Sequence, residues 1–260
     1  MGKIFRYTLS DLLRSYWTYL YSGFFLLFTA ALFAFAAHTT NVIISLMNVM
    51  LVLCPLIAAM FGVMYYYSSR DFIELLLAQP LRRRDIFLGQ YLGLSVSLSL
   101  GWVIGVSLPF IAWGGITPEN GLVFALLLFC GVVLTAIFAA LAFWIALKNE
   151  NRIMGFGKAI LLWLFFAVIY DGLVLLLLIG FKDYPLEGAS IALSMLNPVD
   201  LTRILLLLQL DISALMGFTG AVFRQFMGTY LGMLVAIAAL SVWVVLPVWR
   251  MLRVLFTKDF

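Results

Sequence analysis

The fold class is decided by residues 42–65, which read VIISLMNVMLVLCPLIAAMFGVMY. These 24 residues hold no charged side chain, and about 20 apolar residues in a helix suffice to cross the hydrocarbon core of a bilayer. Backbone amides in lipid must find their hydrogen-bond partners within the segment, so a spanning stretch of this kind has to be helical. The stretch therefore predicts a membrane-spanning helix.

The composition extends this prediction to the whole chain. Of its 260 residues, 65% are hydrophobic and 11% are charged. Soluble domains carry about 25% charged residues, so this chain has too few to cover a water-soluble core. We therefore predict an all-α integral membrane protein that forms a single domain over residues 1–260.

Six runs of low charge are long enough to span a membrane. The polar string from His38 to Asn41 separates the first two runs, and the fifth is apolar except for Asp171. We predict spanning helices at about residues 20–37, 42–65, 90–112, 121–147, 159–181 and 226–249.

The positions of lysine and arginine predict the orientation of these spans. If both termini are cytoplasmic, thirteen of the 16 basic residues fall in cytoplasmic segments. The opposite side then holds only Lys182, Arg203 and Arg224. Because positive side chains concentrate in cytoplasmic loops, we predict that both termini are cytoplasmic.

Residues 2–19 are predicted to form an amphipathic helix. Phe5, Leu9 and Leu12 recur at helical spacing on one face, while Lys3 and Arg6 lie on another. A basic amphipathic helix of this type lies along the membrane surface. The alternative is a basic terminus that only sets the topology.

A second short helix is predicted in the cytoplasmic segment 68–80. Ser68 and Asp71 have the spacing of a capping box, Pro80 should end the helix, and Asp85 can cap the third span. The helix carries apolar residues that need a cover, either the membrane surface or another protein: Phe72, Ile73, Leu75, Leu76 and Leu77. The alternative is an ordinary positively charged loop.

Residues 182–224 form the largest segment between spans, and we predict an outer helical lobe there. Asn197, Pro198 and Asp200 together mark a helix start, with a capping side chain, a proline at the first helical position and an acid in the first turn. The apolar run 205–208 that follows must be covered by lipid headgroups, by neighbouring helices or by another subunit.

Residues that could carry chemistry are few. The chain has no phosphate-binding loop, no serine-nucleophile elbow and no zinc-protease motif, and its single histidine excludes a multi-histidine metal or haem site. It also lacks a basic, aromatic-rich soluble stretch, which argues against nucleic-acid binding. Asp171 is an acid within a span, where acids are costly; it is either a structural hydrogen-bonding group or a functional one.

Sulfur-containing side chains form a stripe in the second predicted span. Met47, Met50 and Cys54 share one helical face. Such soft ligands suit Cu(I), but methionine is also an ordinary packing residue in apolar helices. Both interpretations stay open from the sequence, and no other metal site is predicted.

The layout of the chain resembles the permeases of ABC-2-type ABC transporters. More narrowly, it resembles the permeases of Nos systems, which serve maturation of the copper centre of nitrous oxide reductase. The strings that carry the resemblance are Ile86-Phe87-Leu88-Gly89-Gln90, Glu74-Leu75-Leu76-Leu77-Ala78-Gln79-Pro80, Asn197-Pro198-Val199-Asp200-Leu201, residues 208–217 and residues 219–223.

The resemblance implies a homodimer in the bacterial inner membrane, driven by two cytoplasmic ATPase subunits that bind ATP and Mg²⁺, with no catalytic group or cofactor in this chain. The residues implied to contact the ATPase are Arg70, Asp71, Phe72, Glu74, Leu75, Gln79, Pro80, Arg82, Arg83 and Arg84. The residues implied to meet a periplasmic β-helical partner are Asn197, Pro198, Asp200, Arg203, Gln209 and Asp211.

The mechanism implied is mechanical coupling, in which closure of the ATPase dimer pushes the short helix and rearranges the spans. The substrate that the family suggests is a sulfur species. Two alternatives remain: a general exporter of lipophilic compounds or lipids, and a channel or secondary transporter that needs no ATPase.

Overall fold

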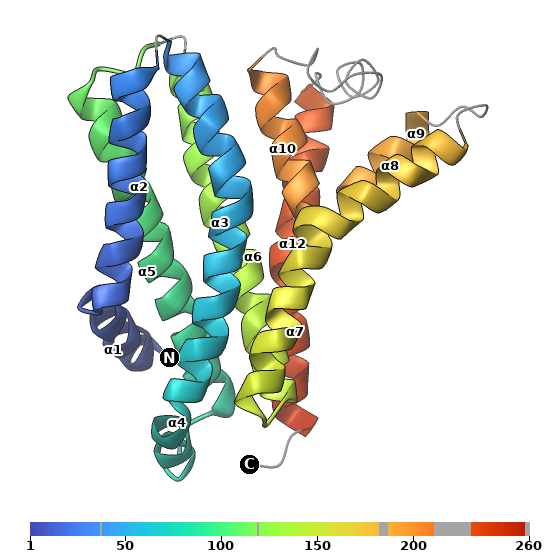
Figure 1. The fold of residues 1–260 in the computed structure, drawn as a ribbon. Helices are drawn as coiled ribbons and strands as arrows, with labels where there is room; N and C mark the ends of the chain where they lie inside the picture. The colour runs from blue at the N-terminus through green and yellow to red at the C-terminus, as the bar shows by residue number, and fades with distance from the viewer. Residues whose placement is uncertain (37, 119, 182–186, 211–229, 258–260) are drawn as a thin grey trace.

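The computed structural model describes residues 1–36, 38–118, 120–181, 187–210 and 230–257, and in these residues every regular element is a helix. Six helices are long and apolar enough to cross a membrane (Figure 1). The elements are α1 (Gly2–Leu13), α2 (Tyr16–Phe35), α3 (Thr39–Ser68), α4 (Arg70–Leu77), α5 (Arg83–Ala112), α6 (Gly121–Lys148), α7 (Arg152–Leu164), η1 (Phe165–Ile169), α8 (Tyr170–Gly180), α9 (Glu187–Met195), α10 (Pro198–Gln209) and α12 (Tyr230–Thr257).

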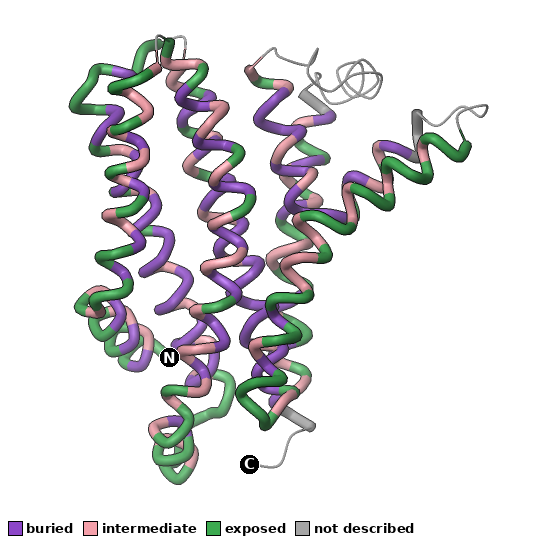
Figure 2. Tube along the Cα trace, viewed as in Figure 1, coloured by how far each residue is buried: buried purple, intermediate pink, exposed green. Residues whose placement is uncertain are grey.

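Helix α6 is the centre of the bundle. It packs against α3, α5, α7, α10 and α12, and its buried side chains include Phe138 and Phe143. Figure 2 shows buried residues along the helices of the bundle. Close approach to α3 depends on small residues, because a Cβ added at Gly62 would lie 2.6 Å from Cβ of Ala142. Van der Waals contact between closely spaced helices is the main attraction available in lipid.

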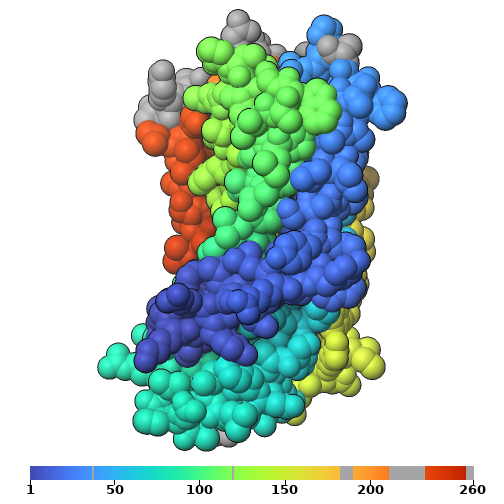
Figure 3. Space-filling view, turned by 90° about the vertical axis from the view of Figure 1, so that its left-hand side faces the viewer, coloured from blue at the N-terminus to red at the C-terminus, as the bar shows by residue number. Residues whose placement is uncertain are grey.

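Helix α5 holds α1 and α2 through two pairs of glycines. Gly89 and Gly93 face α1, while Gly101 and Gly105, further along α5, face α2. A Cβ added at Gly93 would lie 2.5 Å from Cγ2 of Thr8. Each pair has the small-xxx-small spacing that lets helices pack closely, and α1 consequently lies across the surface of the bundle (Figure 3).

The fifth candidate span, Arg152–Gly180, is bent. It consists of α7, the π-helical turn η1 and α8, and beyond η1 the helix leans away from the bundle (Figure 1). A π-turn widens the helix by one residue and is a recognised cause of a kink. The bend separates α8 from α6 and leaves room for α10, which packs against α3, α6, α9, α12 and η1.

The six predicted spans are confirmed as helices, but only the fourth, Gly121–Lys148, has nearly the predicted ends. The fifth begins at Arg152 rather than at residue 159. The third begins at Arg83 rather than near residue 90, and the last extends to Thr257 rather than residue 249. The capping predictions around α4 were wrong. The N-cap of α4 is Ser69, without a side-chain hydrogen bond, and Asp85 lies within the first turn of α5, whose N-cap is Arg82.

Candidate functional site

Helix α4 stands at one end of the bundle, together with α1 and the C-terminal end of α12 (Figure 1). It links α3 to α5, so both long helices meet at this short element. Ile73 is its buried residue, and Phe72 stacks on Tyr7 of α1 with ring centroids 5.2 Å apart. The helix is therefore attached to the bundle on one side and open on the other.

The residues predicted to contact an ATPase gather on this open side. Phe72 is half-buried in its stack, and the guanidinium of Arg70 donates to the carboxylate of Glu74 across 3.1 Å. The exposed members of the set are Arg70, Asp71, Glu74, Leu75, Gln79, Pro80, Arg82, Arg83 and Arg84. Leu75 is 67% exposed, so this open side carries an apolar side chain among its charges.

The anchor of α4 is reinforced from the neighbouring loop. The hydroxyl of Tyr67, one residue before the end of α3, donates to the backbone carbonyl of Asn149 across 2.6 Å. Ser69 donates to the carbonyl of Tyr65 and accepts from the amide of Gln90 on α5. These bonds fix the junction of α3 and α4 relative to α5 and α6.

A second site lies at the turn between α9 and α10. The side-chain amide of Asn197 donates to the carbonyl of Phe166 in η1 across 2.9 Å, while its oxygen caps α10 by accepting from the backbone N–H of Val199. Tyr170 of α8 donates to the carbonyl of Leu193 across 2.6 Å. The indole of Trp243 in α12 donates to the carbonyl of Met195 across 3.0 Å, so three elements hold this turn.

Charged groups join α8 to α10 beside this turn. One nitrogen of Arg203 lies 2.6 Å from Asp171 and 3.0 Å from Asp200. Asp171 Oδ2 accepts the shorter bond, and its Oδ1 is buried and accepts no bond from the residues that the structure describes. The cluster carries two acids and one base, so its formal charge is negative when both acids are ionised.

The pKa of Asp200 is raised to about 7. Burial is the largest cause, followed by a hydrogen bond and charge repulsion from Asp171; Arg203 and Asn197 oppose the rise. The attraction of Arg203 does not bring the pKa of Asp200 back to its ordinary value, because the closer contact of Arg203 is with Asp171. Asp200 therefore changes charge near neutral pH.

The helix start at Asn197, Pro198 and Asp200 is confirmed, and the apolar run that follows is covered by the chain itself. Leu205, Leu206 and Leu207 are buried, because α10 packs against α3, α6 and α12. The sequence left lipid headgroups, neighbouring helices or another subunit as possible cover for this run, and neighbouring helices are what covers it.

The predicted contacts with an outer partner are unevenly placed. Asn197 and Pro198 are buried, and Asp200 and Arg203 are bonded within the chain. Gln209 is exposed, whereas Asp211 lies outside the described residues. Contact with a partner stays a prediction, for which Gln209 offers the accessible side chain.

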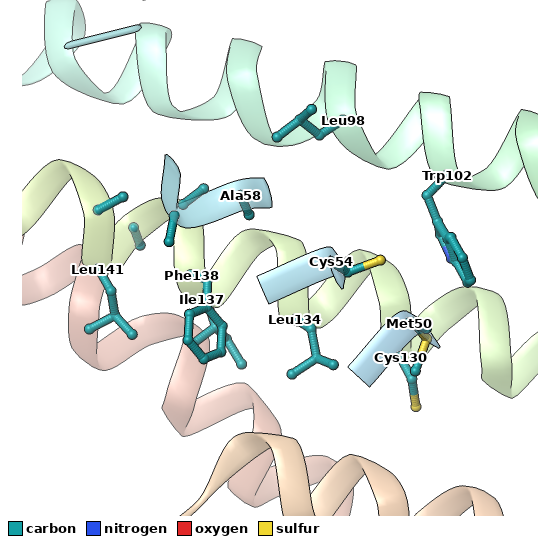
Figure 4. Close-up of a cluster of buried hydrophobic side chains, with 14 of the residues drawn as sticks. Met50, Cys54, Ala58, Leu98, Trp102, Cys130, Leu134, Ile137, Phe138 and Leu141 are labelled. Atoms are coloured by element: carbon teal, nitrogen blue, oxygen red, sulfur yellow. The ribbon is translucent and has the colours of Figure 1, made fainter. Parts of the chain in front are cut away.

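The sulfur stripe lies inside the packed core. Met47, Met50 and Cys54 are each at most 2% exposed. In Figure 4, Met50 and Cys54 lie among apolar side chains of α5 and α6, including Trp102 and Leu134. The hydroxyl of Tyr21 is 3.5 Å from the Cys54 sulfur. These positions are those of packing residues, and the Cu(I) site stays a prediction.

The glycine pairs and the hydrogen bonds to the α9–α10 turn were not anticipated. The spacing Gly89–Gly93 and Gly101–Gly105 is visible in the sequence and could have indicated which face of α5 receives α1 and α2. The bonds from Tyr170 and Trp243 had no comparable signal, because their acceptors are backbone carbonyls of another helix.

Six candidate spans, two amphipathic segments at one end and a packed helical hairpin between the fifth and sixth spans define a multi-pass membrane protein of the transporter type. A model of the ABC-2 family of transporter proteins matches residues 25–260. The chain therefore belongs to the ABC-2 family and is a transporter permease.

Two curated relatives carry the same description, "Probable ABC transporter permease protein NosY". The protein from Pseudomonas aeruginosa PAO1 is 27% identical over 227 residues, which cover 81% of this chain and 82% of the relative. The protein from Stutzerimonas stutzeri is 26% identical over 265 residues, which cover 95% of this chain and 92% of the relative. The resemblance to Nos permeases is thereby confirmed as a similarity.

Proposed function

We propose that this permease converts ATP hydrolysis by a separate cytoplasmic ATPase into movement of its spans, and that α4 is the element on which the ATPase acts. The observation that carries the proposal is the geometry of α4. It is a short helix between two long helices, anchored by Ile73 and by the Phe72–Tyr7 stack, with its charged residues and Leu75 exposed.

A push on α4 has a defined route into the bundle. Helix α3 runs from α4 along α6, and α5 carries α1 and α2 on its glycine pairs. Helices packed this closely move as units rather than deforming gradually. Displacement of α4 is therefore passed to α3 and α5 and to the helices packed on them.

The charge distribution supports a cytoplasmic placement of the α4 end. The described basic residues at this end are Lys3, Arg6, Arg14, Arg70, Arg82, Arg83, Arg84, Lys148, Arg152, Lys158, Arg250 and Arg253. Arg203, which was predicted to lie on the other side, is paired with two acids. A concentration of lysine and arginine at one end is the pattern of a cytoplasmic face.

The system that this permease serves is, in our proposal, copper-site assembly of nitrous oxide reductase in a bacterial inner membrane. The names of the two relatives support it. The working unit would be a homodimer with two ATPase subunits and a periplasmic β-helical protein, exporting a sulfur species or transmitting force. The apolar face of α8, where Leu176 is 66% exposed, is open to lipid or to a second copy.

The ATPase contact is tested by Leu75→Asp in the full chain co-expressed with the ABC ATPase subunit of the same organism's Nos-type system. Leu75 makes no buried contact, so the substitution should leave folding intact while placing a charge in an apolar contact. We expect co-purification of the ATPase to fall at least tenfold, which corresponds to about 1.4 kcal/mol.

Ile116→Asp is the matched control, because Ile116 is also exposed (46%) but lies in the loop between α5 and α6 at the opposite end. Unchanged co-purification in Leu75→Asp, or an equal loss in Ile116→Asp, would exclude α4 as the specific contact.

The copper-site assignment is tested in cells by deleting the gene and assaying the copper and sulfide content of nitrous oxide reductase. We expect a reductase that is synthesised but lacks its catalytic copper–sulfur centre, with recovery from the wild-type gene and not from the Leu75→Asp variant. A fully assembled reductase in the deletion strain, together with ATPase activity stimulated by lipophilic compounds, would favour the general exporter instead.

A further inference from the structure

A cavity of about 480 Å³ opens between α1, the last turns of α3 and α4. Its volume is within the range of small-molecule sites. Its walls combine two kinds of side chain. Asp11, Arg14 and Ser68 contribute polar groups, while Phe61 and Met64 contribute apolar surface.

The two charged residues of the cavity are of opposite sign and unpaired. Asp11 and Arg14 are three residues apart at the end of α1, yet they form no ion pair with each other. Within the described part of the chain, neither side chain makes a hydrogen bond or an ion pair. By contrast, the hydroxyls of Tyr65 and Ser69 in the same wall are already bonded within the protein. A positive and a negative group are thus both available to one ligand.

The cavity lies at the depth of the membrane–water interface. Tyr16, Trp17 and Tyr19 follow α1 directly and are 51–74% exposed. Exposed tyrosine and tryptophan side chains concentrate at the depth of the lipid headgroups. The ring of Trp17 contacts Phe61, one of the apolar walls, edge to face at 6.2 Å. The cavity therefore opens where headgroups lie.

We propose that this cavity binds the headgroup of a phospholipid with a primary ammonium group, that is, phosphatidylethanolamine. Arg14 and the hydroxyl of Ser68 receive the phosphate, Asp11 receives the ammonium, and an acyl chain runs over Phe61 and Met64. A guanidinium and a carboxylate give the short, charge-assisted hydrogen bonds that such a zwitterion requires. Phosphatidylglycerol has no positive group for Asp11, and the trimethylammonium of phosphatidylcholine has no N–H to donate.

The site also has a mechanical consequence, which rests on the proposed role of α4. Phe72 of α4 lines the cavity and stacks on Tyr7 of α1. A bound headgroup therefore fills the space behind α4 and stiffens its attachment to α1. Lipid binding itself does not depend on an ATPase, so failure of either proposal can be recognised separately.

The test is native mass spectrometry of the full chain after detergent exchange, titrated with phosphatidylethanolamine, phosphatidylcholine or phosphatidylglycerol of identical acyl chains. We expect the first bound phosphatidylethanolamine to be held roughly tenfold more tightly than either other lipid. Asp11→Asn should remove the preference over phosphatidylcholine. Arg14→Gln should weaken all three lipids, because all carry the phosphate.

Arg6→Gln is the matched control, since it removes the same charge from the same helix outside the cavity. Equal affinity of the wild type for the three lipids would overturn the proposal, as would equal losses in Arg6→Gln and Arg14→Gln. Displacement of the lipid by free phosphoethanolamine at the same concentration would show a soluble ligand instead and would overturn the lipid assignment.

Discussion

Arg203 of α10 donates to Asp171 of α8 across 2.6 Å, and this contact joins the outward-leaning half of the fifth span to the bundle. No residue of α8 is buried, so packing contributes little to its position. The ion pair and the hydrogen bond from Tyr170 to Leu193 are the polar links between α8 and the α9–α10 hairpin in the described residues. Asp171 thus has a structural role, whether or not it also has a functional one.

Removing the charge at either end of this pair should destabilise the protein unequally. Asp171→Asn keeps an acceptor for Arg203 and should cost about 1 kcal/mol, because both side chains are about a third exposed and the pair is screened. Arg203→Gln should cost more, because it leaves Asp171 facing Asp200 without a counter-ion. The measurement is the thermal midpoint of the purified full chain.

The control for this pair is Arg70→Gln, which breaks the exposed pair with Glu74 and should leave the midpoint almost unchanged. Identical midpoints for Arg203→Gln and Arg70→Gln would show that the Asp171 contact does not hold α8. In an assay of ATP-dependent transport by the permease and its ATPase, we further expect Asp171→Asn to lower the transport rate while the complex still assembles. A transport rate equal to that of the wild type would leave Asp171 with its structural role alone.

Stability should fall as the pH rises from 5 to 8. The pKa of Asp200 is raised to about 7, whereas an unfolded aspartate has a pKa near 3.9, so the folded state holds a proton that the unfolded state has lost in this interval. The proton bound to the folded state stabilises it at low pH, and the stabilisation is lost as the pH approaches and passes 7. Thermal midpoints across this range provide the measurement.

Asp200→Asn should flatten that pH profile and raise the midpoint at pH 8 relative to the wild type, because a neutral side chain no longer has to ionise beside Asp171. A profile in Asp200→Asn as steep as that of the wild type would assign the pH dependence to another group.

The spans were predictable because charge-free runs report where a chain can enter lipid, but helix ends were less so. The last helix continues past Arg250 and Arg253 to Thr257, whereas the predicted span ends at residue 249. The guanidinium of Arg253 lies 3.7 Å from the centre of the Trp249 ring, so the helix accommodates this charge without ending. Hydropathy marks the membrane crossing, whereas the helix itself extends as far as its side chains can be solvated.

The α10 site was only half predictable. Local signals at Asn197, Pro198 and Asp200 were sufficient for the helix start, since a cap involves neighbouring backbone groups. The partner of the Asn197 amide is the carbonyl of Phe166, 31 residues earlier in a π-turn. No periodicity distinguishes that turn from ordinary helix, so the bend of the fifth span and the path of α10 required the structure.

The docking of α1 should depend on Gly93. A side chain there would collide with Thr8, and overpacking of this kind costs about 1–3 kcal/mol. We expect Gly93→Leu to lift α1 from α5 and expose Thr8, which is fully buried. The measurement is maleimide labelling of Thr8→Cys, which should be slow alone and at least several-fold faster when combined with Gly93→Leu.

Gly157→Leu is the control, because nothing lies within 4 Å of a Cβ added at Gly157. The native Cys54 and Cys130 are buried and should give little background. Equal labelling in the Gly93→Leu and Gly157→Leu backgrounds would show that the glycine pair does not position α1.

The two ends of the bundle should label from opposite sides of the membrane. Leu75 on α4 and Ile116 between α5 and α6 are both exposed, and they lie at opposite ends. Because basic side chains gather at the α4 end, we expect a membrane-impermeant maleimide added to intact spheroplasts to label Ile116→Cys and not Leu75→Cys. Permeabilised cells should label both, which shows that each cysteine is reactive. Labelling of Leu75→Cys in intact spheroplasts would invert the proposed orientation and place α4 beyond the reach of a cytoplasmic ATPase.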